Sequence, residues 1–343
     1  MSTTSEAQTA RQSHGGPVSA VGRFLGALRG RINFRAIDER AKRPVRLFVA
    51  GGGTRELMHA LDPSGQSHGT VLAPFDSAPG WSVADEATRA VLYFAGPSGE
   101  PGSIARLSNL SLPVFIVEQT PLASDLGTGM FTSGPRERPA AGKPARYPVA
   151  SLDPIELRKH LLPDVVHACR DREIALAAAL AVFRPVVAAK LTVDCAVNSL
   201  KIAGASAIAD HVPVIGLLTG GIASAGDTIA ITALQANMLL HIAAAYGRPA
   251  GARRIVELLP VIGGGYGWRA LARELSGFIP GVGIIVKAAI AYAGSLVVGQ
   301  AASYYYETGT TMAPDKLSTL YREAADRAKE LTGQLAGRIR KKQ

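Results

Sequence analysis

The stretch RLFVAGGGTREL, from Arg46 to Leu57, predicts the beginning of an α/β domain. A short apolar run ends in three glycines, and the segment that follows them favours a helix. Strand, turn and helix form the unit from which parallel sheets are built. The turn of such a unit lies at the carboxyl end of its strand, where many α/β proteins hold a phosphate. The sequence therefore offers one candidate phosphate site, formed by Gly51, Gly52, Gly53 and Thr54.

The residues that hold a phosphate chemically are missing from this turn. The pattern GxxxxGK[ST] needs a lysine for the phosphates and a hydroxyl for magnesium. When the pattern starts at Gly51, its last three positions hold Glu56, Leu57 and Met58. The dinucleotide pattern GxGxxG also needs a glycine where Glu56 stands. We therefore expect a turn whose glycines allow tight packing, with an empty phosphate position and no cofactor.

Short apolar runs alternate with helical segments as far as about residue 170. Most of the runs are followed by turn residues, as is typical of parallel strands that are buried on both faces. Asp153 followed by Pro154 predicts the start of a helix over 154–170. The pattern predicts a doubly wound α/β domain over 45–170. Its expected strands are 45–51, 69–74, 89–96, 112–119 and 146–152.

The composition of the chain changes at about residue 171, where Ala, Leu, Ile and Gly become frequent and patterns typical of strands become rare. Breaks at Gly and Pro predict an all-α domain of several hairpins over 171–310. Gly247 follows a long helical run and predicts a helix end, as Pro280-Gly281 does further on. An amphipathic helix with a basic end is expected over 311–343.

The order of strands and helices in the first domain resembles that of a Ras-like or Era-like GTPase domain. The end of the final expected strand, VASLD (149–153), resembles the SAL-type motif of that family. The guanine-reading NKxD motif is absent, because Pro121 stands where its aspartate belongs. The resemblance implies a pseudo-GTPase, which is a GTPase scaffold without the nucleotide machinery. The alternative is a GTPase-class nucleotide-binding protein with non-standard motifs.

Three stretches of the second domain resemble the YcjF-like family. This is a bacterial domain of unknown function, found in inner-membrane proteins and behind Era-type GTPase domains. Leu234 departs from the family pattern, which favours Asn before the Gln. The resemblance implies a helical fold and membrane association, and it implies no reaction. The matching stretches are RPVVAAKLTVDCAVNSLKIAGASAIADHVPVIGLL (184–218), AGDTIAITALQANMLLHIAAAYG (225–247) and GFIPGVGIIVKAAIAYAGSLVVGQAASYYYE (277–307).

Two runs of this domain, Thr228–Gly247 and Ser276–Tyr306, have the length of roughly 20 apolar residues that a membrane span needs. The chain as a whole is apolar, with 47% hydrophobic and 19% charged residues. The first run nevertheless holds several polar side chains, which need partners in lipid or in a core. Both a soluble bundle and an interior-facing membrane hairpin fit this pattern. We interpret Asp227, Thr232 and Gln235 as a buried polar spot.

The net charge of +10 resides entirely at the two ends of the chain. Residues 1–46 hold nine Lys and Arg against three Asp and Glu, residues 338–342 add four basic residues, and the body between them is neutral. Residues 1–44 are read as a disordered tail followed by a basic amphipathic segment. Such ends suit an anionic membrane surface, and their alternative role is to solubilise the protein. The membrane-surface candidates are Arg23, Phe24, Leu25, Leu28, Arg29, Arg31, Arg338, Arg340, Lys341 and Lys342.

Enzymatic signatures do not stand out in the sequence. Cys169 and Cys195 lie outside any CxxC pattern, which predicts a reducing compartment and no metal site. No Ser-His-Asp grouping or carboxylate pair is evident, and no nucleic-acid-binding module accompanies the basic ends. The sequence therefore favours an interaction or scaffolding protein at the cytoplasmic face of the inner membrane, integral or peripheral. Its expected partners are the membrane surface and either a GTPase or another copy of the chain.

Overall fold

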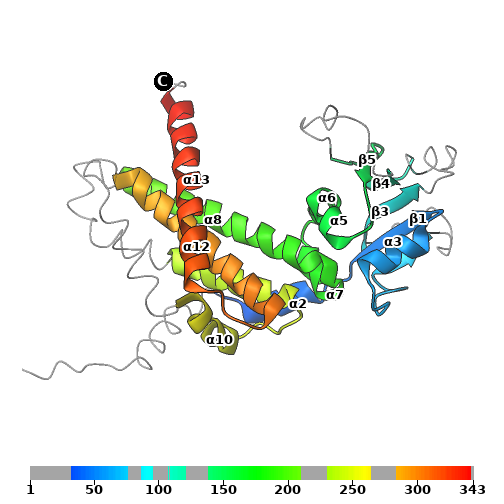
Figure 1. Ribbon diagram of the computed structural model, residues 1–343, viewed down its shortest axis with the longest axis horizontal. Coiled ribbons are helices and arrows are strands. Elements are labelled where there is room, and N and C mark those ends of the chain that lie inside the picture. The colour runs from blue at the N-terminus through cyan, green and yellow to red at the C-terminus, as the bar shows by residue number, and fades with distance from the viewer. Residues whose placement is uncertain are drawn as a thin grey trace, which may run out of the picture.

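The computed structural model describes residues 32–75, 86–95, 107, 109–120, 138–209, 230–263 and 283–340. Strands occupy the first half of the chain, and long helices occupy the second half (Figure 1). The strands are β1 (Arg46–Gly51), β2 (Leu72–Pro74), β3 (Thr88–Ala95), β4 (Val114–Gln119) and β5 (Ala145–Val149). The helices are α2 (Phe34–Ala41), α3 (Thr54–Leu61), α5 (Pro154–Lys159), α6 (Leu161–Ala168), α7 (Glu173–Ala179), the 3-10 helix η2 (Ala181–Phe183), α8 (Arg184–Ala209), a helix over 230–245, α10 (Ala252–Gly263), α12 (Gly283–Thr308) and α13 (Pro314–Arg340).

The five strands form one parallel sheet in the order β2-β1-β3-β4-β5. This result confirms the predicted α/β organisation, and each expected strand is present within a few residues of its expected bounds. The order is that of flavodoxin-like doubly wound sheets, in which ligands bind between β1 and β3 at the carboxyl ends of the strands. Gly51 and Phe94 are paired in register at that point.

The sheet is buried on both faces, which explains the continuous apolar runs in its strands. Leu47 and Val49 of β1 face a core that also includes residues of α3, α5, α6 and α7. Phe48 and Ala50 face the other side, where Phe75 and Leu107 belong to the same cluster. Successive residues of β1 therefore serve opposite faces, as the period of two in a strand requires.

The helix predicted over 154–170 is two helices, α5 and α6, so the prediction of one helix was wrong. Its start is confirmed, because the Asp153 carboxylate accepts a hydrogen bond of 2.7 Å from the N–H of Ile155, and Pro154 occupies the first turn. The break falls at His160, whose backbone φ is −141°. Pro163 explains it, since its ring lacks an N–H and would clash with the carbonyl of Lys159 in a continuous helix.

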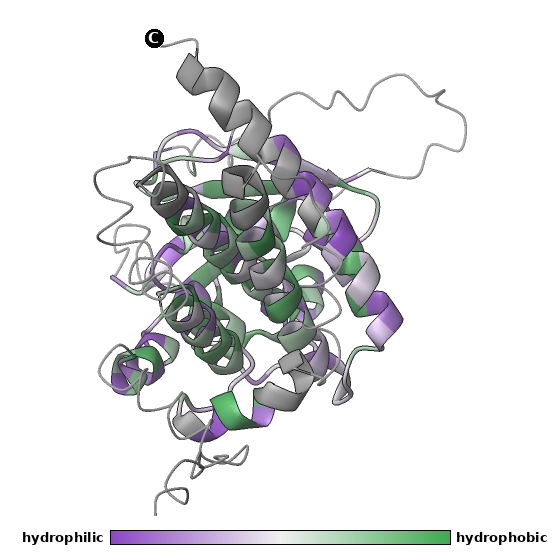
Figure 2. Cartoon of the chain, turned by 90° about the vertical axis from the view of Figure 1, so that its left-hand side faces the viewer, coloured by the Kyte–Doolittle hydropathy of each residue, from purple (hydrophilic) through white to green (hydrophobic). Residues whose placement is uncertain are grey.

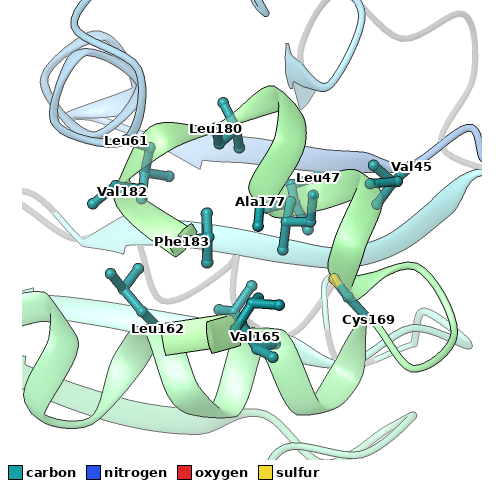
Figure 3. Packing of buried hydrophobic residues seen from close by; sticks show 14 of the residues in the cluster. Val45, Leu47, Leu61, Leu162, Val165, Cys169, Ala177, Leu180, Val182 and Phe183 are labelled. Carbon is teal, nitrogen blue, oxygen red and sulfur yellow. The ribbon is translucent and has the colours of Figure 1, made fainter. Parts of the chain in front are cut away.

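The core below the sheet continues into the helical half of the chain. Phe183 and Val187 belong to the same buried cluster as Leu47, and so does Leu240 of the helix over 230–245. Figure 3 shows Phe183 in this shared core together with Leu47. The boundary expected at residue 170 therefore lies inside a continuous core, where α7, η2 and the start of α8 join the two halves.

The long helices pack closely on one another beyond this junction. α8 lies along α12, and the first half of α13 packs on α12 through residues such as Tyr321 and Ala324. The central helices are largely hydrophobic, while the described part of α13 carries more hydrophilic residues (Figure 2). The approach of α8 to α12 depends on Gly299, because a Cβ there would lie 2.2 Å from Oγ1 of Thr192.

Gly247 ends the helix over 230–245, which confirms that prediction. Its φ is +73°, a conformation that glycine adopts without strain. The N–H of Arg248 bonds to the carbonyl of Ala243, and the N–H of Gly247 bonds to the carbonyl of Ala244, both at 2.9 Å. These two bonds form the Schellman motif. The second expected break, Pro280-Gly281, lies outside the described residues.

The described ends of the chain lie at opposite edges of the molecule. α2 lies low in Figure 1 and contacts the turn before α10, where Asp38 accepts a hydrogen bond of 2.7 Å from the N–H of Ala250. α13 ends at the top of the same view. Of the helices in the described ranges, none has the length and apolar character that crossing a bilayer requires.

Candidate functional site

The turn between β1 and α3 is too short to wrap a phosphate in the manner of a phosphate loop. β1 ends at Gly51 and α3 begins at Thr54, so only two residues separate them. The position of the phosphate-loop lysine is Leu57, which lies in the second turn of α3 and is fully buried. Met58 is buried as well, and Glu56 is exposed. These three residues belong to a helix that packs on the sheet.

The glycines of the turn allow β3 to approach it closely. Gly51 has a φ of +99°, and a Cβ at this position would lie 2.2 Å from the carbonyl oxygen of Phe94. A Cβ at Gly53 would lie 1.8 Å from Cδ1 of the Phe94 ring. Any side chain at either glycine would therefore collide with β3. The glycines therefore let the turn pack directly on β3 at the point where ligands bind in sheets of this order.

An open hollow of about 520 Å³ lies beside the start of α3, towards the end of β2. Thr54 hydrogen-bonds the Gly51 carbonyl through its hydroxyl at 2.7 Å, so this hydroxyl serves the turn. Arg55 and Glu56 are exposed neighbours of opposite charge. Such a lining suits water and small polar groups better than it suits a polyphosphate, because the carboxylate offsets the single arginine charge. The lining residues are Gly52, Thr54, Arg55, Glu56, Met58, His68 and Pro74.

Gln235 of the expected polar spot belongs to a chain of hydrogen bonds between three helices. Its Nε2 donates to Oγ of Ser295 on α12 at 3.1 Å. Ser295 Oγ lies 2.9 Å from both Ser199 Oγ on α8 and the Ala291 carbonyl, and its single proton can serve one of them at a time. Ser199 and Ser295 are completely buried. Sequence patterns did not identify these two serines, because serine is common in helices of every kind.

The structure describes one of the other two members of the expected spot. Thr232 is half-buried and is not part of this hydrogen-bond chain among the described residues. Asp227 lies outside the described residues. Their spacing allows Thr232 and Gln235 to share a helix face, whereas Asp227 does not fit the same stripe. The hydroxyl groups linked to Gln235 in the structure come from α8 and α12, which are distant from it in sequence.

A polar group built around the buried Glu173 and His241, with the half-buried Arg40 and Lys190, joins α2 to the two halves of the molecule. Glu173 of α7 places Oε1 3.7 Å from Nη2 of Arg40 on α2 and 4.0 Å from Nζ of Lys190 on α8. Nη1 of Arg40 lies 3.3 Å from Nε2 of His241. Burial, together with the charge of Arg40, lowers the pKa of His241 to about 4. The histidine is therefore neutral at pH 7, and its Nε2 can accept a hydrogen bond from Arg40 when Nδ1 donates to the Asn237 carbonyl.

The two cysteines are buried within the apolar clusters. Burial raises the pKa of Cys169 to about 12 and also raises the pKa of Cys195, so both are protonated at neutral pH. Among the residues that the structure describes, no three His, Cys, Asp or Glu side chains gather in a way that could hold a metal ion.

Most of the membrane-surface candidates cannot be placed. Residues 23–31, Lys341 and Lys342 lie outside the described residues, and Arg338 and Arg340 are described only as part of helix α13. The end of the amphipathic segment, from residue 32 onward, docks on the protein itself, because Ile32 and Ile37 are buried in the main core.

The chain gives no match to a protein-family model, to a curated protein or to a solved structure.

Proposed function

We propose that this chain is a membrane-associated interaction or scaffolding protein. It combines a pseudo-GTPase α/β module with a YcjF-like helical module and acts at the cytoplasmic face of the inner membrane. Its partners are an anionic membrane surface and either a GTPase or a second copy of the chain. The proposal assigns no reaction to the protein.

The packing of Phe94 on the glycine turn is the observation that supports the pseudo-GTPase part of the proposal. Nucleotide binding in a doubly wound sheet needs open space at the switch point and free backbone N–H groups that face it. Here the Phe94 ring lies where a Cβ of Gly53 would be, and α3 begins after only two residues. These features support a module whose sheet serves packing and presentation.

The continuous core supports a scaffolding role for the two halves together. α7, η2 and the start of α8 belong to the same buried cluster as the strands. The polar group of Arg40, Glu173, Lys190 and His241 ties α2 to the same junction. A junction of this kind favours a fixed arrangement of the two modules, as a scaffold requires.

Membrane contact is assigned to the basic ends. Each favourably placed cation adds about 1 kcal/mol of attraction to an anionic surface. The two basic regions, 23–31 and 338–342, lie at opposite ends of the sequence, so variants of each region test its own contribution to membrane contact.

Two measurements on the full chain test the proposal. Calorimetry with GTP and magnesium is expected to give no binding heat, and micromolar affinity would instead favour the alternative of a nucleotide-binding protein with non-standard motifs. Fractionation of cells is expected to place the chain with the membranes. Release by a high-salt or carbonate wash indicates peripheral attachment, and release by detergent alone indicates insertion. Recovery in the soluble fraction before any wash would contradict membrane association.

A further inference from the structure

Three arginines from separate parts of the chain surround Asp171 in the turn between α6 and α7. Nη1 of Arg43, in the segment between α2 and β1, lies 3.4 Å from the Asp171 carboxylate. Nη2 of Arg89, the second residue of β3, lies 3.7 Å from it. Nε of the adjacent Arg172 lies 3.6 Å from it. One carboxylate therefore faces three guanidinium groups.

The single carboxylate leaves this arginine cluster (Arg43, Arg89 and Arg172) with an excess of positive charge. The three contacts are longer than the 2.7–2.9 Å that is typical of charge-assisted hydrogen bonds. The Nε atoms of Arg89 and Arg172 are buried and have no hydrogen-bond acceptor. Glu173, the next acidic residue along the chain, is paired with Arg40 and Lys190 instead. A partly buried cation without full compensation is costly, so the cluster favours a further anion.

The cluster is accessible from solvent and is separate from the glycine turn. The side chains of Arg43 and Asp171 are 43% and 54% exposed. Arg89 lies at the beginning of β3, and the glycine turn follows the end of β1. Because the strands are parallel, the arginine cluster lies at their amino ends and the glycine turn lies at their carboxyl ends.

The backbone of Asp171 adds a second observation. Its φ is +59°, the only positive value of any residue other than glycine among those described. This conformation is uncommon outside glycine, although Asp and Asn tolerate it best. The turn thus holds a carboxylate among the arginines in a conformation that glycine would adopt more easily. The Asp171 carboxylate is therefore the internal anion of the arginine cluster.

We propose that Arg43, Arg89 and Arg172 form a binding site for a phosphate dianion, which displaces the Asp171 carboxylate. A dianion brings two negative charges to the three guanidinium groups, one more than the carboxylate that it displaces. Guanidinium groups bind phosphate oxygens through pairs of parallel hydrogen bonds. The terminal nitrogens of Arg43 and Arg89 make these bonds. Arg172 contributes its charge, because its Nε is covered and its Nη1 donates to the Pro44 carbonyl at 2.8 Å. The phosphate is either free in solution or the phosphomonoester of a lipid headgroup, and the site does not depend on the proposed scaffolding function.

The first test is the binding of inorganic phosphate to the full chain, measured by calorimetry at constant ionic strength with chloride as the reference anion. Arg43→Gln is expected to weaken phosphate binding by roughly tenfold, as the loss of one charged hydrogen-bond donor does. Arg35→Gln is the matched control, because Arg35 is exposed, carries the same charge and pairs with Glu39 on α2. It is expected to leave the affinity unchanged. Equal losses in the two variants would overturn the proposal, since the attraction would then be general.

Asp171→Gly provides the opposite test. Glycine adopts a φ of +59° without strain, and this gain offsets part of the cost of leaving the arginines without their carboxylate. Removal of the competing carboxylate is expected to raise phosphate affinity by roughly tenfold. An unchanged or lower affinity would overturn the proposal even if an arginine variant failed to fold.

Vesicles distinguish the two sources of phosphate. If the ligand is a lipid headgroup, Arg43→Gln reduces binding to vesicles that contain phosphatidic acid and leaves binding to phosphatidylserine vesicles unchanged. If the ligand is free phosphate, Arg43→Gln changes the calorimetry alone. An absence of phosphate binding in both assays would refute the site.

Discussion

Nη1 of Arg40 lies 3.3 Å from Nε2 of His241, although 201 residues separate the two along the chain. His241 is buried, and its Nδ1 lies 2.9 Å from the Asn237 carbonyl. Glu173 and Lys190 complete the charged group around Arg40. This contact holds α2 at the junction of the two halves. It also makes the stability of the protein depend on pH, through the titration of His241.

We predict that the protein loses stability as the pH falls from about 6.5 to about 4. Burial lowers the pKa of His241 from 6.5 to about 4, so in this range the unfolded chain binds a proton that the folded chain does not. A difference of this size corresponds to at most roughly 3 kcal/mol. Urea unfolding at a series of pH values measures the effect.

His241→Gln removes the titrating group and keeps a side chain that can hydrogen-bond. The slope of stability against pH is expected to become much flatter in this variant. A remaining slope is expected from His167, whose pKa is also lowered, first by burial. An identical slope in the variant and the parent would show that His241 is not the cause.

A second prediction concerns the contact between Phe94 and the glycine turn. Gly53→Ala is expected to destabilise the protein by roughly 1–3 kcal/mol, because the new Cβ would lie 1.8 Å from the Phe94 ring. In a Phe94→Leu background the same change is expected to cost less, since Cε1, at 2.2 Å from the new Cβ, is gone and the smaller leucine side chain can turn away. Thermal or urea unfolding of the four proteins gives the coupling energy.

Gly51→Ala is the comparison that separates side-chain crowding from backbone strain. Its new Cβ would meet the carbonyl oxygen of Phe94 at 2.2 Å, at a φ of +99°. Phe94→Leu leaves that oxygen in place, so it is not expected to rescue Gly51→Ala. Equal rescue at both glycines would contradict the described packing.

A third prediction concerns the approach of α8 to α12. Gly299→Ala is expected to destabilise the protein by roughly 1–3 kcal/mol, because the new Cβ would lie 2.2 Å from Oγ1 and 2.5 Å from Cγ2 of Thr192. Thr192→Ala removes both atoms and is expected to recover part of this loss. Gly204→Ala is the control, since a Cβ there meets nothing within 4 Å and helix propensity favours Ala by up to about 1 kcal/mol. Stability losses of similar size at Gly204 and Gly299 would argue against the close contact.

The elements that follow local rules were predictable from the sequence. The five strands are short apolar runs, and Gly247 and Asp153 are recognisable helix ends because caps depend on a few neighbouring residues. The sequence indicates that Gln235 needs a hydrogen-bond partner, but that partner, Ser295, and the Ser199 hydroxyl beyond it are distant in the chain. Contacts of this kind, including that of Phe94 with the glycine turn, depend on how the strands and helices come together. No local pattern encodes them.

The packing of α2 on the protein decides which variants can test membrane contact by the basic ends. A truncation that starts at residue 47 would remove α2 together with the contacts of Arg40 and Asp38. Substitution of the charges in the full chain avoids this loss. The N-terminal variant replaces Arg23, Arg29 and Arg31 with Gln, and the C-terminal variant replaces Arg338, Arg340, Lys341 and Lys342 with Gln.

The central claim is that the chain binds a membrane surface without the help of a nucleotide. Flotation of the full chain with vesicles, in the presence and absence of GTP and magnesium, tests it most directly. We predict binding to anionic vesicles at about 0.1 M salt, loss of that binding at about 1 M salt, and no effect of GTP, because the Debye length falls from about 10 Å to about 3 Å. Each charge variant is expected to bind more weakly than the parent. An absence of binding to anionic vesicles, or binding that requires GTP, would contradict the account.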